Sequence, residues 1–364
     1  MDEAADLLRK AFLALVISMA PRMACPPPAV TAPSAQAEVH AEESEAAWTM
    51  PADPIAEGTA GVKWAIDSSG NLYFEAGELN RDDGWRSEGR ELWINEIRVV
   101  PTAGCSKLIL PEDCSSLFWN FYSLTGIDTA RFDTSHVTTM ELMFGGCCSL
   151  RDLDLSSFET SQVEDLYGMF FSCSALESLD LSGFDTSHVS NMNGMFFSCT
   201  GLQNADLSGF DTSHVSNMKD MFYQCESLVS LDLSSFDTSQ TENAKYMFRH
   251  CHSLESIDLS GFDTSRLWDD RCEYLLEDCP SLQRINLSQK FFNGNLVNSG
   301  LLAGDIRWVL EDQPDNVKTW SEMTRAWTDE DAGWRILSCS SPVFDTGEGT
   351  EIEPLYELTG SSID

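Results

Sequence analysis

Residues 179–199 read LDLSGFDTSHVSNMNGMFFSC, and close variants of this stretch return every 26 residues along the middle of the chain. Six copies are marked by the phenylalanine of a Phe-Asp/Glu-Thr-Ser step, which stands at Phe132, Phe158, Phe184, Phe210, Phe236 and Phe262. A sequence period of roughly 20 to 50 residues is the signature of stacked repeats, in which each unit packs on its neighbours. The sequence therefore predicts a solenoid.

Each repeat contains two patterns that predict different local structures. The alternation of leucine and aspartate at 179–181 predicts a short strand with the leucines directed inward. The apolar residues from Val189 to Cys199 are spaced by three and four, which indicates one buried face of a helix. We therefore predict an α/β solenoid of 26-residue strand-helix units over residues 114–289. The expected N-caps of the helices are Asp133, Asp185, Asp211, Asp237 and Asp263.

The segment before the repeats is assigned as a β-rich N-terminal cap, over residues 61–113. Its hydrophobicity alternates, and a hairpin is predicted between 62–67 and 71–74. Such a cap would cover the apolar end of the first repeat, which has no neighbour on that side. Three tryptophans are assigned to the core of the cap, at Trp64, Trp85 and Trp93.

The segment after the repeats is assigned as a small irregular C-terminal cap, over residues 290–339. It contains four tryptophans in a polar stretch, at Trp308, Trp320, Trp327 and Trp334. A carbohydrate-binding segment is the alternative, because tryptophan faces stack on sugars. Residues 340–364 are acidic and predict a disordered tail.

The first 60 residues have the layout of a targeting segment followed by a linker. A ten-residue apolar run at 11–20 follows two basic residues and precedes an Ala-Gln-Ala site. This layout predicts a signal peptide over residues 1–37, and the run is too short to span a bilayer. Lipid attachment at Cys25 and a buried helix are the alternatives. Residues 38–60 are rich in Ala, Glu and Pro and predict a flexible linker.

The composition bounds the partners of the protein. There are 59 Asp and Glu residues against 22 Lys and Arg residues, which gives a net charge of −37. A field of this sign repels nucleic acid and anionic lipid, so we expect no nucleic-acid partner. The sequence has no hydrophobic run of transmembrane length.

The complete repeat pattern carries a family resemblance. The string L-x-x-L-D-L-S-x-F-D-T-S-x-V-x-x-M-x-x-M-F-x-x-C resembles the repeat of BspA-like leucine-rich-repeat surface proteins of bacteria, over about residues 114–289. The resemblance implies a leucine-rich-repeat solenoid, secretion, and a role in adhesion or host interaction without catalytic residues. Members often carry a wall-sorting motif or a membrane anchor. Residues 360–364 show neither, so we expect loose association with the surface.

One apolar position of each repeat holds a cysteine. Equivalent atoms in stacked copies lie about 4.8 Å apart, which is within disulfide range. A ladder of five cannot pair completely, however, and we predict small buried apolar residues with a structural role. Cys105 with Cys114, or Cys339 with a partner, is the better disulfide prediction. The ladder consists of Cys147, Cys173, Cys199, Cys225 and Cys251.

Two further rows of side chains are candidates for ligand binding. The strand aspartates are expected on the outer face of the sheet, either for solubility or as a cation site such as a Ca²⁺ site. They are Asp154, Asp180, Asp206, Asp232 and Asp258. The second row, Phe171, Phe197 and Tyr223, follows the Met-Phe pair. Three consecutive helix residues cannot all face a core, so this row is predicted to be a partly exposed binding stripe. Packing against the neighbouring helix is the alternative.

The sequence shows no arrangement that supports catalysis. Gln162 and Gln240 occupy the repeat position that elsewhere holds His136, His188 and His214, which argues against a catalytic or metal role there. The sequence contains no C-x-x-C pair, phosphate-binding loop or H-E-x-x-H motif. We therefore predict that the protein is not an enzyme and uses no cofactor.

Together these features predict a secreted or surface-associated binding protein that acts outside the cell. Its ligand is expected to be a protein or a glycan at a cell surface or in a matrix. One alternative is a passive structural spacer without a specific ligand. The other is a carbohydrate-binding protein that acts through the tryptophan-rich C-terminal segment.

Overall fold

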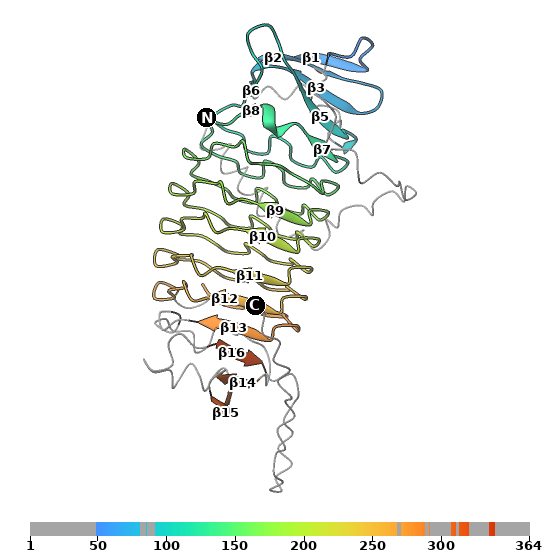
Figure 1. The fold of residues 1–364 in the computed structure, drawn as a ribbon. Coiled ribbons are helices and arrows are strands. Elements are labelled where there is room, and N and C mark those ends of the chain that lie inside the picture. Colours follow the sequence, from blue (N-terminus) through green and yellow to red (C-terminus); the bar gives the residue numbers. More distant parts are fainter. Residues whose placement is uncertain are drawn as a thin grey trace, which may run out of the picture.

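The computed structural model describes residues 49–80, 85, 92–267, 271–287 and 291, and the backbone of 307–310, 313–319 and 335–338. Figure 1 shows an elongated stack, with a sheet of the N-terminal segment at one end and the strands of successive repeats one above another. One contiguous hydrophobic core runs through it. The predicted signal peptide, residues 38–48 of the predicted linker, Cys339, the acidic tail, and Trp320, Trp327 and Trp334 lie outside the described residues. Residues 56–60 of the predicted flexible linker form a strand, β1.

The N-terminal sheet has five strands in the order β1-β2-β3-β5-β7. β2 and β3 pair antiparallel, which confirms the predicted hairpin. β3, β5 and β7 are parallel, and β7 already belongs to the first repeat, so this sheet continues into the stack. The strands are β1 Ala56–Ala60, β2 Val62–Ile66, β3 Asn71–Glu75, β5 Glu96–Val100 and β7 Gly126–Ile127.

A smaller parallel sheet joins the same two regions, in the order β4-β6-β8. Its strands are β4 Gly77–Glu78, β6 Leu108–Ile109 and β8 Phe132–Asp133. Two tryptophans fill the core beside the N-terminal sheet: Trp64 is 4% exposed and Trp85 is fully buried, edge-on to Phe74. Trp93 is 38% exposed in a turn before β5, so its assignment to the core is wrong.

The predicted repeat strand is present in the copies from residue 178 onward, where it is parallel to its neighbours, whereas residues 150–155 of the preceding copy form no strand. In β9 the leucine at 179 is buried and the flanking Asp180 is exposed, as the alternation predicts. β9 pairs with β10, β11 pairs with β12, and β12 pairs with β13. The bounds are β9 Ser178–Asp180, β10 Asn204–Asp206, β11 Ser230–Asp232, β12 Ser256–Leu259 and β13 Arg284–Leu287.

The predicted helix of each repeat is wrong, and the chain is a β-solenoid rather than an α/β solenoid. The described residues contain no α-helix, and their helical content is limited to short 3-10 turns such as Thr129–Arg131. The segment after each strand is a series of turns that contains two residues with positive φ, four positions apart, such as Gly168 and Ser172 at 55° and 56°. Left-handed residues cannot continue an α-helix. Accordingly, no helix in the described part is long and apolar enough to cross a membrane.

The turns replace helical hydrogen bonds with bonds between copies. Backbone N–H groups alternate between two acceptors: Met169 donates to Leu166 at 3.2 Å, within the turn, and Phe170 donates to Met195, in the next copy, at 2.9 Å. This alternation satisfies the buried backbone along the stack. The apolar spacing of three and four still marks buried positions, because the turns direct the same residues inward.

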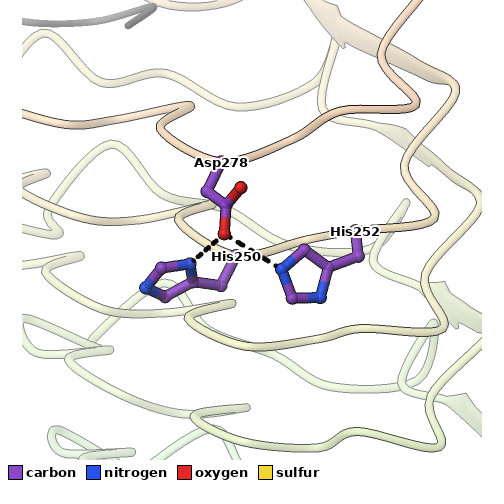
Figure 2. Close-up of side chains that lie close together, drawn as sticks. All are labelled: His250, His252 and Asp278. Atoms are coloured by element: carbon purple, nitrogen blue, oxygen red, sulfur yellow. Dashed lines mark hydrogen bonds and ion pairs between the residues drawn. The ribbon is translucent and has the colours of Figure 1, made fainter.

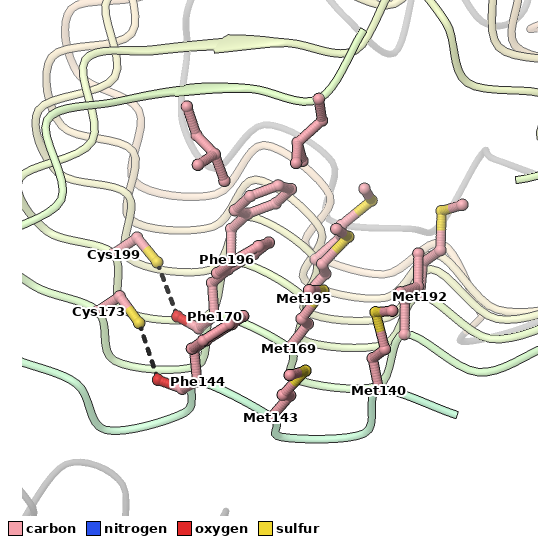
Figure 3. Close-up of a cluster of buried hydrophobic side chains, with 14 of the residues drawn as sticks. Met140, Met143, Phe144, Met169, Phe170, Cys173, Met192, Met195, Phe196 and Cys199 are labelled. Carbon is pink, nitrogen blue, oxygen red and sulfur yellow. Dashed lines mark hydrogen bonds between the residues drawn. The ribbon is translucent and has the colours of Figure 1, made fainter. Parts of the chain in front are cut away.

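The interior is built from ladders of identical side chains. Phe144, Phe170 and Phe196 stack with ring centroids 6.1 and 5.6 Å apart, and methionines form parallel columns beside them (Figure 3). All of these side chains are fully buried. Each copy therefore covers the apolar face of the next, which accounts for the need to stack.

The aspartates predicted as helix N-caps have another role, because no helix follows them. Asp185 accepts a bond from the backbone N–H of Ser187 at 3.1 Å and one from its hydroxyl at 2.6 Å. A side chain that bonds the backbone two residues on forms an Asx-turn. These aspartates therefore fix the corner between strand and turns.

The C-terminal end is closed by strands rather than by an irregular segment. The sheet of β11, β12 and β13 continues antiparallel in the order β13-β16-β14-β15. These strands are β14 Arg307–Leu310, β15 Gln313–Thr319 and β16 Arg335–Ser338. The exposed edge of the last repeat strand is thus paired, which prevents association with another sheet edge.

Candidate functional site

The repeats present a continuous surface that we call the turn face. It is formed by the outward-directed side chains of the turn segments that precede each new strand. In one copy Leu166, Met169, Phe170 and Cys173 are buried in the core, while Tyr167 is partly exposed on the other side. The turn segments are 114–122, 140–148, 166–174, 192–200, 218–226, 244–252 and 272–280.

An aromatic row runs along the first part of the turn face. Phe171 stacks on Phe197, and Phe197 stacks on Tyr223, each with ring centroids 4.7 Å apart. The Trp119 ring lies 6.0 Å from Phe171 and passes over Gly145, where an added Cβ would meet the indole at 2.4 Å. Glycine at this position therefore makes room for Trp119, and the row is longer than the sequence predicted.

The row is less exposed than predicted. Phe171 and Phe197 are only 5% and 6% exposed, so the expectation of a partly exposed stripe is wrong for these two rings. They form a second hydrophobic cluster with Leu142, against which Trp119 and Tyr223 pack. The stacking of rings on one another accounts for this burial. A role of Phe171, Phe197 and Tyr223 in ligand binding stays a prediction.

The row continues into tyrosines and an arginine at the C-terminal copies. Tyr246 and Tyr274 stack with ring centroids 5.6 Å apart. The guanidinium carbon of Arg249 lies 5.3 Å from the Tyr246 centroid and 5.6 Å from the Tyr274 centroid. Cations placed over aromatic faces at such distances are attracted by the ring quadrupole. All three side chains are partly exposed.

The cations of this region are paired across copies. Lys245 Nζ lies 2.8 Å from a Glu273 carboxylate oxygen, and Arg249 pairs with Glu277. Both acids belong to the following copy. Nearby, Asp220 is 4% exposed and pairs with Lys219 at 3.0 Å. Desolvation raises the pKa of the Asp220 carboxyl, against the opposing effect of Lys219.

Two histidines and an aspartate meet beside the tyrosines. His250 Nδ1 and His252 Nε2 lie 2.7 and 3.0 Å from the same carboxylate oxygen of Asp278 (Figure 2). Bonds from His250 and then His252 lower the pKa of Asp278. Tyr223 meets the His250 ring edge-on at 5.3 Å, which joins this cluster to the aromatic row. The repeat pattern of the sequence did not predict this group.

The strand aspartates form the expected row, and each is used by its own backbone. Asp180 and Asp206 are opposite each other in β9 and β10. Asp180 Oδ1 accepts bonds from the Ser182 N–H at 3.0 Å and hydroxyl at 2.7 Å, and these bonds lower its pKa. The equivalent serine N–H bonds occur at Asp154, Asp206, Asp232 and Asp258. A turn-forming role thus explains the row, and cation binding there stays a prediction.

The cysteine ladder is buried in the reduced form. The Cys173 thiol donates to the Phe144 carbonyl oxygen at 3.2 Å, and the Cys199 thiol donates to the Phe170 carbonyl oxygen at 3.0 Å (Figure 3). Burial raises the pKa of Cys173 to about 12. The whole ladder is free of disulfides, and the same holds for Cys105 and Cys114, so the predicted disulfide between those two is wrong. Cys148, next to the ladder, is disulfide-bonded.

Comparison with known proteins gives a family similarity over the repeats. A family described as "Mycoplasma protein of unknown function, DUF285" matches residues 112–228 and 177–290, which together are just under half of the chain. A search of curated proteins found no match. The similarity coincides with the repeat array, and a BspA-like assignment does not follow from it.

Two solved structures are similar in part. A leucine-rich cell-surface protein from Faecalibacterium prausnitzii is 12% identical with a TM-score of 0.28, covering 65% of this chain and 77% of its own. The Toll–Spätzle complex of Drosophila is 13% identical with a TM-score of 0.20, covering 61% of this chain and 34% of its own. At these TM-scores neither likeness defines the function of this chain.

Proposed function

We propose that this protein is a non-enzymatic binding protein that acts outside the cell or at its surface, and that it holds a protein ligand on the C-terminal part of its turn face. The observation that carries this proposal is the partly exposed group of Tyr246, Arg249 and Tyr274. Tyrosine and arginine are enriched in protein interfaces and supply most of the residues whose loss is costly. The chain has a net charge of −37, so an ordered surface group of two tyrosines and an arginine stands out from the rest of its acidic surface and suggests a binding role.

The geometry favours a protein ligand over a glycan. Sugars stack on free aromatic faces, but Tyr246 and Tyr274 are stacked on each other and Arg249 covers both rings. The ring edges stay partly exposed, and the Arg249 guanidinium, already paired with Glu277, is oriented for further hydrogen bonds to peptide groups. The ring faces are therefore occupied, and the polar rim is what a partner would meet.

The turn face is also suited to binding because it is preorganised. Tyr246 and Tyr274 have positive φ values of 61° and 58°, and both are fixed by backbone bonds, with Tyr246 N–H donating to Glu273 at 3.1 Å. Side chains that are already ordered lose little conformational entropy on binding. A solenoid repeats this arrangement along a surface, which supports an extended contact with a partner.

An array of purified extracellular-matrix proteins and glycans, probed with the full chain, tests this proposal. We expect binding to protein spots that falls more than about tenfold in a variant with Tyr246→Asn, Arg249→Gln and Tyr274→Asn. Asparagine tolerates positive φ, so the turns should be kept. Val229→Ser, an exposed apolar residue on the strand side at 42% exposure, is the matched control.

Two outcomes would overturn the proposal. Retention of protein binding by the triple variant would move the ligand to another surface. Absence of all binding, or binding to glycan spots alone, would favour the structural spacer or the carbohydrate-binding alternative.

A further inference from the structure

The last turn segments bring three metal-ligating side chains together. The ligand atoms of His250, His252 and Asp278 all lie within 4.8 Å of one another. Figure 2 shows both imidazole rings directed at one carboxylate oxygen, with the histidines on one turn and the aspartate on the next. A group of two histidines and one aspartate is a common ligand set for divalent transition metals.

The placement of these residues follows from the stack. His250 and His252 flank the buried Cys251, so both project outward from one turn segment. Asp278 occupies in the following copy the position that His250 occupies in its own, and the His250 N–H donates to the Glu277 carbonyl at 3.0 Å. The backbone therefore aligns Asp278 with His250.

The positions are held firmly. His250 and Asp278 have positive φ values of 64° and 58° within the turns, which leaves their backbones little freedom. The edge-on contact with Tyr223 restrains the His250 ring. His252 and Asp278 are exposed, so an ion in solution can reach them. Ligands that are already ordered favour metal binding because they need no rearrangement.

We propose that His250, His252 and Asp278 form a binding site for a divalent transition metal ion of the Zn²⁺ type. His250 Nδ1, His252 Nε2 and one oxygen of Asp278 would be the ligands. Two imidazoles and one carboxylate suit zinc, whereas Ca²⁺ and Mg²⁺ require oxygen ligands. Three protein ligands leave a fourth position for water or for a side chain of a partner.

The distances are compatible with this ion. Tetrahedral zinc with ligand bonds of about 2.0–2.2 Å separates its ligand atoms by about 3.4 Å. The two hydrogen bonds to Asp278 measure 2.7 and 3.0 Å, so each nitrogen must withdraw by less than 1 Å. The metal would replace the protons that now join the three groups. Rotation of the exposed His252 and Asp278 side chains suffices for this change.

Two kinds of competing site can be separated from this one. The ladder thiols are poor ligands in the folded protein because burial raises their pKa, to about 12 for Cys173. The many exposed carboxylates of this acidic chain bind hard cations weakly, and millimolar Mg²⁺ saturates them without occupying imidazoles.

Calorimetric titration of the full chain with ZnCl₂ in millimolar MgCl₂ tests the proposal. We expect a saturable site whose affinity falls more than about tenfold in His250→Gln, in His252→Ser and in Asp278→Asn. Gln224 and Ser174 occupy the corresponding positions of other copies, so these variants keep residues that the turns accept. The control is His188→Gln with His214→Gln, which removes two exposed histidines outside the cluster and should leave the titration unchanged.

A Co²⁺ absorption spectrum of the same proteins identifies the ligands independently. Bands of a nitrogen- and oxygen-ligated ion that disappear in Asp278→Asn support the site. A thiolate-to-cobalt charge-transfer band would overturn it, and so would unchanged zinc binding in the cluster variants or the absence of binding to the wild-type chain.

Discussion

The hydroxyl of Thr186 donates to the backbone carbonyl of Asp211 at 2.9 Å and accepts from the backbone N–H of the same residue, also at 2.9 Å. Thr186 is 1% exposed and Asp211 belongs to the following copy. The same pair of hydrogen bonds joins Thr160 to Asp185 and Thr212 to Asp237. A column of buried threonines therefore joins each copy to the next at the corner between strand and turns.

Replacement of Thr186 by valine should destabilise the array. Valine keeps the shape of the side chain but leaves the carbonyl and N–H of Asp211 without their buried partner. An unsatisfied buried polar group costs about 1–3 kcal/mol, so we expect a lower free energy of unfolding by that amount. Urea unfolding measures it, and Thr186→Ser, which keeps the hydroxyl, is the control. Equal stability of the valine and wild-type chains would contradict the threonine column.

Replacement of Gly145 by alanine should disturb the start of the aromatic row. The added Cβ would meet the Trp119 ring at 2.4 Å, so the indole must move away from Phe171. Strain from an oversized side chain typically costs about 1–3 kcal/mol. We expect a lower urea midpoint and a shift in tryptophan fluorescence. Gly183→Ala, where an added Cβ meets nothing within 4 Å, should change neither quantity.

The buried thiols should resist alkylation in the folded protein. Burial raises the pKa of Cys173 to about 12, so at pH 8 almost no thiolate is available to react with iodoacetamide. Peptide mapping by mass spectrometry should show labelling of the partly exposed Cys105 and protection of the ladder, with full labelling in denaturant. Rapid labelling of Cys173 in the native chain would show that the ladder is open to solvent.

The raised pKa of Cys173 also predicts that the folded protein loses stability at alkaline pH. The folded-state pKa of Cys173 exceeds that of an unfolded thiol, which is about 8.5. The associated stability is complete below the unfolded pKa and is lost as pH rises from there through about 12. The urea midpoint should therefore fall above about pH 9. Cys173→Ala removes this titration, so its midpoint should fall less steeply over the same range.

The sequence predicted the buried positions well and the path of the backbone poorly. Val189, Met192 and Cys199 are fully buried as expected, because burial depends on the spacing of apolar residues. The helix was wrong because successive turns with left-handed residues produce the same spacing. A signal was present: Gly168 and Gly194 stand in the middle of the predicted helices, where glycine costs about 1 kcal/mol each.

The candidate sites were predicted in part for a similar reason. Phe171, Phe197 and Tyr223 occupy the same position in consecutive copies, so the sequence alone identified them as a row. The structure shows that their rings stack. The His250, His252 and Asp278 group requires two positions to be compared across neighbouring copies, with allowance for the two-residue insertion after Leu267. Exposure could not be predicted, because it depends on how far each ring covers its neighbour.

The Asx-turns predict how stability changes in acid. Bonds from the serine hydroxyl and N–H two residues on lower the pKa of the Asp carboxyls, as at Asp133, Asp154, Asp185, Asp211 and Asp232. A carboxyl with a depressed folded-state pKa contributes stability above its unfolded pKa of about 3.9, and that contribution is lost as pH falls through the folded value.

An opposing effect acts at higher pH. The net charge of −37 repels itself near neutrality, and protonation of exposed carboxylates first relieves this repulsion. The urea midpoint should therefore rise slightly from pH 7 to about pH 5 and then fall steeply below about pH 4. High salt screens the repulsion between carboxylates, so it should flatten the rise of the urea midpoint between pH 7 and pH 5. The fall below about pH 4 should remain, because the serine–aspartate hydrogen bonds are short-range. Ser187→Ala together with Ser135→Ala should weaken the acid loss, since each removes a hydroxyl that favours the charged aspartate.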